Sequence, residues 1–294
     1  MSVTAEETLT VERPVGRSAT KPGKDTGVSE TKVNPVKGNG SRATLEVGMM
    51  VGFGLLFLAV WEFLPPALGV PRYIIPTFSQ CMAEFARMWA QEDLGPNFIS
   101  TLISSIVGFG LGALLGAGAG YLLGMSKLWE RVLAPYILAL QIAPKVAFAP
   151  LFIMWFGYNS IPKLLVTVLI VFFPILVNVL QSMKTVDQDL MNLARVYSMS
   201  RWKMFLKIEL PSSLPQLFAG LRISSTLAVI GVTVGELVGG NTGLGFLITY
   251  GEGQANTAMV FDAIILLTII GVALYFAVAA VEKRVLHYLE RNDG

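Results

Sequence analysis

The chain has 294 residues, of which 53% are hydrophobic and 14% are charged, with a formal net charge of +2. Soluble domains carry about a quarter charged residues, so this composition excludes an ordinary soluble protein and predicts an all-α integral membrane protein. Cys81 and His287 are the only cysteine and the only histidine. A disulfide within the chain and the usual cysteine- or histidine-based metal sites are therefore excluded, and His287 is expected to be solvated.

The first 44 residues form a polar segment with no aromatic side chain and no apolar period. Their Gly, Pro, Ser, Thr and Lys content predicts a disordered tail over 1–44, followed by a transmembrane domain over 45–294. Seven Lys or Arg residues in this tail predict that it stays in the cytoplasm.

Six apolar stretches follow the tail, and each is long enough to cross a bilayer core as a helix. We predict them at 47–64, 98–124, 132–156, 164–180, 215–240 and 260–281. Pro65 and Pro66 are expected to end the first stretch, and Pro174 to kink the fourth. Between these stretches, a short helix is expected over 79–90 and a Gly-rich outer connection over 241–257.

Small residues recur at every fourth position of the second stretch, from Ser100 to Gly124. Small side chains let two helix backbones approach closely, so we expect this stripe to pack against a neighbouring helix. The alternative is a sliding surface that lines a pore.

Two charged residues within the predicted spans are candidates for a translocation pathway, Lys145 and Glu236. Lys145 follows Pro144 near mid-membrane, where an unpaired charge is expensive. It must either face a watery cavity, where it would attract an anionic solute, or pair with a carbonyl at the Pro144 kink. Glu236, with Asp262, flanks the outer end and is also open to an interfacial interpretation, and Arg222 is expected to snorkel to the interface.

A polar segment, Thr185–Pro211, interrupts the apolar pattern between the fourth and fifth stretches. Its apolar residues fall at helical spacing, which predicts two short amphipathic helices joined at an angle. Thr185 and Gln188 match a capping box at the first helix, Ser200 is expected to cap the second, and Pro211 to stop it. An ordinary connecting loop is the alternative interpretation.

The basic residues are distributed unequally between the two sides of the predicted membrane. Six spans place both termini on one side, and the connections on that side with the C-terminal tail contain most of the Lys and Arg outside the N-terminal tail: Lys127, Arg131, Lys184, Arg195, Arg201, Lys203, Lys207, Lys283, Arg284 and Arg291. The opposite connections contain Arg72, Arg87 and Lys163. The positive-inside rule therefore predicts cytoplasmic termini and a cytoplasmic polar segment.

The polar segment resembles the cytoplasmic signature loop of binding-protein-dependent ABC importer permeases, whose pattern is E-A-A, three residues, G, nine residues, I-x-L-P. Ala194, Ile208, Leu210 and Pro211 match this pattern, whereas Asn192, Leu193 and Ser198 replace the Glu, the first Ala and the Gly. The resemblance implies a type I permease fold of six transmembrane helices, whose coupling helices over 185–211 dock on an ATPase. The residues it implies for this coupling are Ala194, Ser198, Arg201, Ile208, Leu210 and Pro211.

The third stretch resembles one subgroup of these permeases, which imports nitrate, alkanesulfonates, taurine and pyrimidine precursors. That subgroup has the pattern P-x-x-A-x-x-P-L-x-x-x-W-F-G, and the matching residues here are Pro144, Ala147, Pro150, Leu151, Trp155, Phe156 and Gly157. The Pro-Lys-Val-Ala variant at 144–147 resembles the branch for pyrimidine precursors or riboflavin, with sulfonates and nitrate as alternatives.

Motifs for catalysis by this chain are absent from the sequence. It contains no G-x-x-x-x-G-K-[ST], HExxH or G-x-S-x-G pattern, so we expect a transport subunit and no enzyme, cofactor or nucleic-acid partner. The resemblance implies a separate cytoplasmic ATPase, a periplasmic or lipid-anchored substrate-binding protein and a second, identical permease in the lipid of the inner membrane. A stand-alone secondary carrier or membrane enzyme is the alternative, although only Lys145 is a clear mid-span ionisable group.

Overall fold

The computed structural model describes residues 39–91 and 94–287, with side chains from residue 44 onward. The chain divides into two units, Met1–Gly52 and Phe53–Gly294, and α1 (Asn39–Ala67) runs across the boundary between them. The predicted tail over 1–38 lies outside the described residues. Residues 39–44 belong to α1, so this helix begins before the predicted boundary at 44.

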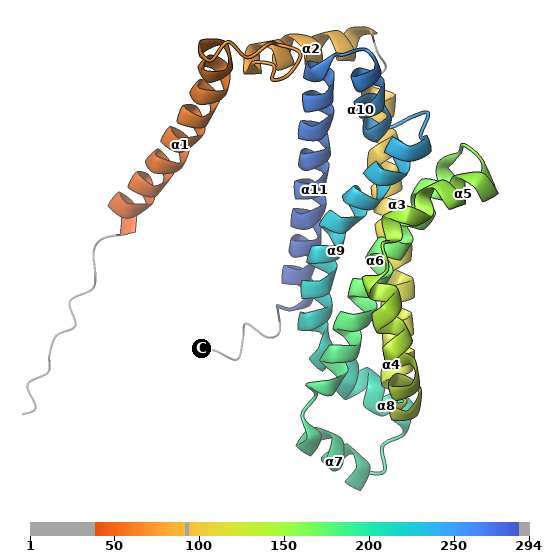
Figure 1. Cartoon of the computed structure of the whole chain (residues 1–294). Helices are drawn as coiled ribbons and strands as arrows, with labels where there is room; N and C mark the ends of the chain where they lie inside the picture. Colours follow the sequence, from red (N-terminus) through yellow and green to blue (C-terminus); the bar gives the residue numbers. More distant parts are fainter. Residues whose placement is uncertain (1–38, 92–93, 288–294) are drawn as a thin grey trace, which may run out of the picture. The chain divides into compact units, whose positions relative to one another are not determined.

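The second unit contains only helices and their connections among its described residues (Figure 1). Beyond α1 they are α2 (Phe78–Gln91), α3 (Leu94–Gly124), α4 (Lys127–Ile142), η1 (Lys145–Phe148), α5 (Ala149–Phe156), α6 (Ser160–Lys184), α7 (Gln188–Val196), α8 (Arg201–Met204), η2 (Phe205–Glu209), α9 (Leu210–Gly239), α10 (Leu244–Gly253) and α11 (Thr257–Val285). Helices α3, α6, α9 and α11 run side by side, with α7 and α8 at one end and α2 and α10 at the other.

Five helices of the described chain are long and apolar enough to cross a membrane, and the bent pair that begins at Lys127 makes a sixth. In lipid a helix satisfies its own backbone hydrogen bonds, which explains why long apolar stretches take this form. The bent pair turns by 79° at Pro144, as the sequence predicted for the interrupted third stretch. The six predicted spans are therefore confirmed, with this broken span as one of them.

Several predicted helix ends are wrong by a few residues. Pro65 and Pro66 lie inside the last turn of α1, which continues to Ala67. Each proline removes one bond to the preceding turn, and the helix ends one residue after Pro66. The Gly-rich connection over 241–257 contains a further helix, α10. The short helix predicted over 79–90 is confirmed as α2.

The contact between α3 and α6 is made by the stripe of small residues. Gly108, Gly112, Gly116 and Gly120 are buried, and a Cβ atom at Gly116 would lie 2.6 Å from the carbonyl oxygen of Phe172. Helices in lipid gain little from the hydrophobic effect against each other, so close backbone contact supplies the attraction. This part of the stripe is a packing surface, as predicted.

We predict opposite effects for two Gly→Ala changes on α3. Gly116→Ala should destabilise the protein by about 1–3 kcal/mol, because a backbone oxygen is in the way and cannot rotate aside. Gly118→Ala, with nothing within 4 Å of the added carbon, should stabilise it by up to about 1 kcal/mol through helix propensity. Thermal unfolding of the purified protein in detergent measures both, and equal effects of the two changes would contradict the packing assignment.

Candidate functional site

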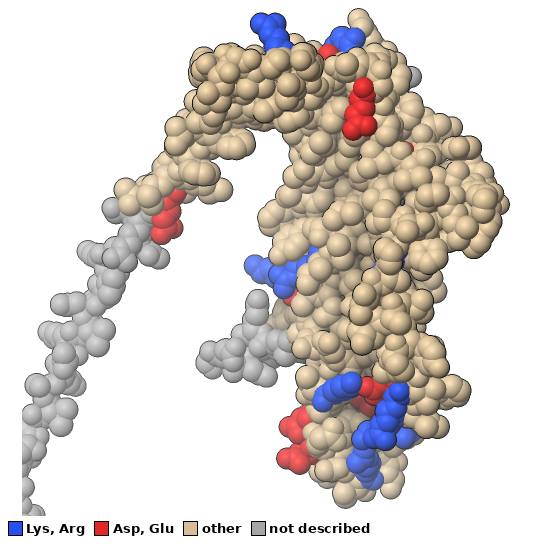
Figure 2. All heavy atoms as spheres, in the orientation of Figure 1, with Lys and Arg blue, Asp and Glu red and all other residues tan. Residues whose placement is uncertain are grey.

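The polar segment 185–211, which we call the coupling segment, forms the charged end of the helical unit. Figure 2 shows Lys, Arg, Asp and Glu gathered over this end, whereas the surface along the spans is mostly uncharged on this face. The segment consists of α7, α8, η2 and the start of α9. The predicted pair of short helices is confirmed, but the second is continuous with the following span, Arg201–Gly239.

The start of α7 differs from the predicted capping box. Asp187 caps the helix, and its carboxylate accepts a hydrogen bond of 2.8 Å from the Asp189 amide. The Thr185 hydroxyl donates to the Ser182 carbonyl at the end of α6 instead. The capping box is wrong because α6 runs on to Lys184 and leaves Thr185 as its last, half-helical residue.

The end of α7 is closed by a left-handed turn at Ser198, whose φ is +51°. The Ser198 amide donates to the Arg195 carbonyl at 2.9 Å, and the Met199 amide donates to the Ala194 carbonyl at 3.0 Å. This pair of bonds is the Schellman arrangement, which favours Gly at the left-handed position. Ser198 therefore adopts the turn for which the signature pattern has Gly, despite its side chain.

The start of the next helix follows directly. The Ser200 side chain accepts a hydrogen bond from the Lys203 amide, which confirms the predicted cap of α8. Pro211 does not stop this helix, contrary to the prediction. It is the second residue of α9, which continues directly from the wider π-helical turn Phe205–Glu209. The missing amide of Pro211 therefore falls where the regular hydrogen-bond ladder already changes from π- to α-helical spacing.

An apolar surface of the coupling segment is left uncovered by the rest of the described chain. Val196 is 80% exposed and Tyr197 75% exposed, and Trp202 on α8 is exposed as well. Ala194, by contrast, is buried. Exposed apolar side chains on a charged, extramembrane end are typical of a surface that binds another protein.

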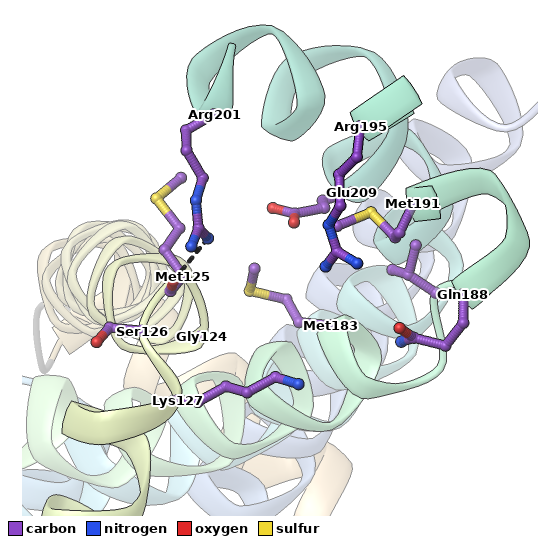
Figure 3. Close-up of a pocket in the computed structure, with 11 residues that line it drawn as sticks. Gly124, Met125, Ser126, Lys127, Met183, Gln188, Met191, Arg195, Arg201 and Glu209 are labelled. Atoms are coloured by element: carbon purple, nitrogen blue, oxygen red, sulfur yellow. Dashed lines mark hydrogen bonds between the residues drawn. The ribbon is translucent and has the colours of Figure 1, made fainter. Parts of the chain in front are cut away.

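A cavity of about 320 Å³ separates the coupling segment from the connection between α3 and α4 (Figure 3). Lys127, Arg195 and Arg201 contribute basic groups to its wall, and Glu209 a carboxylate. Arg201 spans one side and donates through Nη1 to the Met125 carbonyl at 3.3 Å. The coupling segment therefore contacts the membrane helices at this connection as well as through α6 and α9.

Lys145 and Arg222, two of the charged residues within the predicted spans, have partners in the structure. Lys145 Nζ donates to the Gln141 carbonyl at 2.5 Å and lies 5.1 Å from the ring centroid of Phe173. The carbonyl partner expected at the Pro144 kink is therefore present. Arg222 pairs with Glu282, near the end of α11, at 2.8 Å.

Glu236 and Asp262, both expected to flank the outer end, are buried within the protein. Glu236 is 0% exposed and pairs with Lys163 of α6 at 3.1 Å, and Asp262 is 2% exposed. Lys163, assigned from the sequence to an outer connection, is itself 4% exposed. The sequence signal that was missed is a pair of opposite charges at the ends of two spans that lie on the same side of the predicted membrane. Opposite charges in a low-dielectric medium are stabilised by pairing with each other.

The comparison with known proteins identifies the family. Residues 96–287 match the family described as "Binding-protein-dependent transport system inner membrane component". The chain is 33% identical over 234 residues to the riboflavin transport system permease protein RibX of Chloroflexus aurantiacus, covering 80% of this chain and 87% of that protein. It is 32% identical over 244 residues to the formylaminopyrimidine transport permease protein ThiX of Halalkalibacterium halodurans, covering 82% of this chain and 95% of that protein.

Two further comparisons agree with this result. The putative aliphatic sulfonates transport permease protein SsuC of Bacillus subtilis is 30% identical over 249 residues, covering 84% of this chain and 90% of that protein. A solved structure of the MetNI methionine ABC transporter in an inward-facing conformation has a TM-score of 0.59 at 21% identity, over 68% of this chain and 98% of that chain, and so shares the fold.

The chain therefore belongs to the binding-protein-dependent transport family of inner-membrane components. It is a multi-pass permease subunit of an ABC importer, as the signature loop implied. Family membership favours a permease subunit over the two alternatives, a stand-alone carrier and a membrane enzyme. The matched relatives are named as permease proteins of transport systems.

The turn at Ser198 yields a prediction about the coupling segment. Ser198→Gly should stabilise α7 locally by about 1 kcal/mol, because Gly adopts a positive φ without the steric cost that L residues carry there. Leu193→Gly, in the middle of the same helix, should destabilise it by about 1 kcal/mol. Hydrogen exchange of the α7 amides measures both changes. Faster exchange in Ser198→Gly would show that the turn is not held in the left-handed conformation.

Proposed function

We propose that this permease forms the translocation pathway of an importer and is moved by a separate cytoplasmic ATPase that binds the coupling segment. The observation that carries the proposal is the exposed apolar surface around Val196 and Tyr197, at the charged end of an otherwise apolar helical unit. The sequence has no P-loop of its own, so ATP hydrolysis falls to the partner.

The residues that transmit the movement in this proposal are those of the signature loop. They are Ala194, Ser198, Arg201, Ile208, Leu210 and Pro211. Ala194 and Ser198 shape the end of α7, Arg201 ties α8 to the connection before α4, and the remaining three join the segment to α9. Closure of an ATPase dimer would move two such segments together and rotate the attached spans between inward-open and outward-open states.

The assembly we propose is a pair of identical permeases in the inner membrane, with two ATPases inside and a periplasmic or lipid-anchored binding protein outside. Both termini and the coupling segment are cytoplasmic. The excess of basic residues at the coupling end supports this orientation, since positive charge is retained on the cytoplasmic side.

The solute we propose is a small organic molecule or anion: a pyrimidine or vitamin precursor, a sulfonate, taurine or nitrate. The riboflavin and formylaminopyrimidine permeases among the relatives, with the Pro-Lys-Val-Ala variant at 144–147, favour a pyrimidine-precursor or riboflavin-like solute. Ligand-induced stabilisation of the binding protein that co-purifies with this permease tests the choice. Stabilisation by nitrate alone would contradict it.

A role of Lys145 and Glu236 in the pathway remains a proposal. Glu236 is enclosed, so a passing solute does not reach it in this conformation. Lys145 is only partly buried at the break between α4 and η1, where its charge would attract an anionic group. We predict that Lys145→Met lowers the uptake of an anionic solute relative to a neutral one by about tenfold, the factor for a lost interaction of about 1.4 kcal/mol. Full uptake with unaltered preference would end the pathway role.

The function is tested by reconstituting the permease in liposomes with its co-purifying ATPase and binding protein. Uptake should require ATP. Val196→Asp should reduce ATPase association at least about 30-fold, since a charge at the centre of an apolar interface costs 2 kcal/mol or more. Because Val196 is 80% exposed, the fold should be unaffected.

Tyr73→Asp is the matched control for this variant. Tyr73 is 68% exposed and lies at the opposite end of the helical unit, so the same added charge should leave ATPase association unchanged. Equal association of the Val196 variant and the wild type would remove the coupling assignment, and solute flux without ATP would remove the proposed function.

A further inference from the structure

A buried ion pair lies at the end of the spans opposite the coupling segment. Lys163, in the first turn of α6, and Glu236, in the last turn of α9, are 3.1 Å apart and 4% and 0% exposed. Taking either charge alone out of water is expensive, whereas a pair with further hydrogen bonds is tolerated. Lys163 Nζ also donates to the Ser100 hydroxyl of α3, at 3.0 Å.

The remaining hydrogen-bonding capacity of Glu236 is directed at the start of α10. Its Oε2 accepts from the Gly245 amide at 3.0 Å, and it accepts from the Thr101 hydroxyl at 2.9 Å. The Thr101 oxygen in turn accepts from the Leu244 amide at 2.8 Å, and Asn97 Oδ1 accepts from the Gly243 amide at 2.7 Å. Three successive amides are thus bound by side chains of α3 and α9.

These bonds replace a cap that α10 lacks. The first amides of a helix have no partner within it, and a side chain just before the helix usually supplies one. The residue at that position is Gly243, which has no side chain to offer. The first three amides at the start of α10 are therefore bound by side chains of α3 and α9, which fix the position of this helix end.

Close packing leaves little freedom for α10 to move away alone. Gly243 has a φ of +112°, and a side chain there would overlap the Glu236 carboxylate. A Cβ atom at Gly245 would lie 2.6 Å from Glu236 Cβ, and one at Gly235 would lie 2.5 Å from Lys163 Cα. The glycines let the backbone pack directly against Lys163 and Glu236. No space is then left between α10 and the ion pair for α10 to rotate separately.

We propose that Lys163 and Glu236 are positioning residues for transport, which lock α10 to α3, α6 and α9 at the outer end of the permease. The connection between α9 and α11 is then a fixed part of the moving helical body and not a separately opening lid. This inference rests on the proposed function, because it concerns how the outer end moves during ATP-driven uptake.

A reversible crosslink tests the inference with Lys163 and Glu236 both in place. Ser100→Cys replaces the hydroxyl that accepts from Lys163 Nζ, so each oxidised sample is compared with the same sample after reduction, in which that change is also present. The Ser100 and Thr242 hydroxyl oxygens are 3.4 Å apart, so Ser100→Cys with Thr242→Cys places two thiols within reach of a disulfide. The native Cys81 does not interfere, because it is fully buried and burial, aided by the nearby Asp262 carboxylate, raises the pKa of its thiol to about 11.

We expect the oxidised double variant to import solute at the rate of the same sample after reduction. A loss of uptake on oxidation that reductant restores would show that α10 must separate from α3, and would overturn the inference. ATP-independent flux in the reduced sample would instead contradict the proposed function, so the two failures are distinguishable.

A set of charge variants tests the pair itself. Lys163→Met leaves Glu236 buried without its cation and should lower uptake at least about tenfold, with ATP hydrolysis retained, so that more ATP is consumed per solute imported. Adding Glu236→Gln removes the second charge yet keeps an oxygen for the Gly245 and Thr101 donors. Uptake of this double variant should return to within about threefold of the wild type. This loss is smaller than the loss of at least about tenfold expected for Lys163→Met alone.

Arg87→Met is the control, since it breaks an exposed pair with Glu84 at the same end and should not alter the ratio of ATP hydrolysed to solute imported. Unchanged uptake in Lys163→Met, or a double variant no better than that single variant, would overturn the role of the pair.

Discussion

The close approach of α3 to α6 is the contact on which the rest of the structure depends. A lipid bilayer offers no hydrophobic gain for burying one apolar helix against another, so attraction has to come from backbones that approach without side chains between them. Gly112, Gly116 and Gly120 provide that approach on α3. Helix α6 also packs along α9, through Val171, Ile175 and Val179 against Ala228, and so lies between the two. These three helices form the body to which both ends of the permease are attached.

The two ends of this body differ in the side chains that they expose and bury. At the end formed by the coupling segment, Val196 on α7 and Trp202 on α8 are exposed among charged residues, in agreement with the ATPase contact proposed above. At the opposite end the Lys163–Glu236 pair is buried, and Glu236, with Asn97 and Thr101, replaces the missing cap of α10. A movement of the coupling segment is therefore transmitted to α10 as well, because side chains of α3 and α9 hold the start of that helix.

Hydropathy and residue spacing predicted the features that depend on local chemistry. The spans, the packing role of the small residues, the pair of short helices and the cap at Ser200 follow from the sequence alone. The helix ends at Pro65, Thr185 and Pro211 do not, since a proline or a cap can be used in more than one way depending on which turn it joins. The Lys163–Glu236 pair was missed for another reason: 73 residues separate its members, and only the packing of α6 on α9 brings them together.

The central claim is that one copy of this chain transmits motion from the coupling segment to the outer mouth as a single body. Distances between spin labels on Asp189, an exposed residue at the start of α7, and Tyr250 of one protomer, diluted into unlabelled partners, test it most directly in the assembled importer with and without ATP. The account predicts that this distance within the protomer stays constant while the distance between the Asp189 labels of two protomers shortens on ATP binding. A change of the distance within the protomer would contradict it.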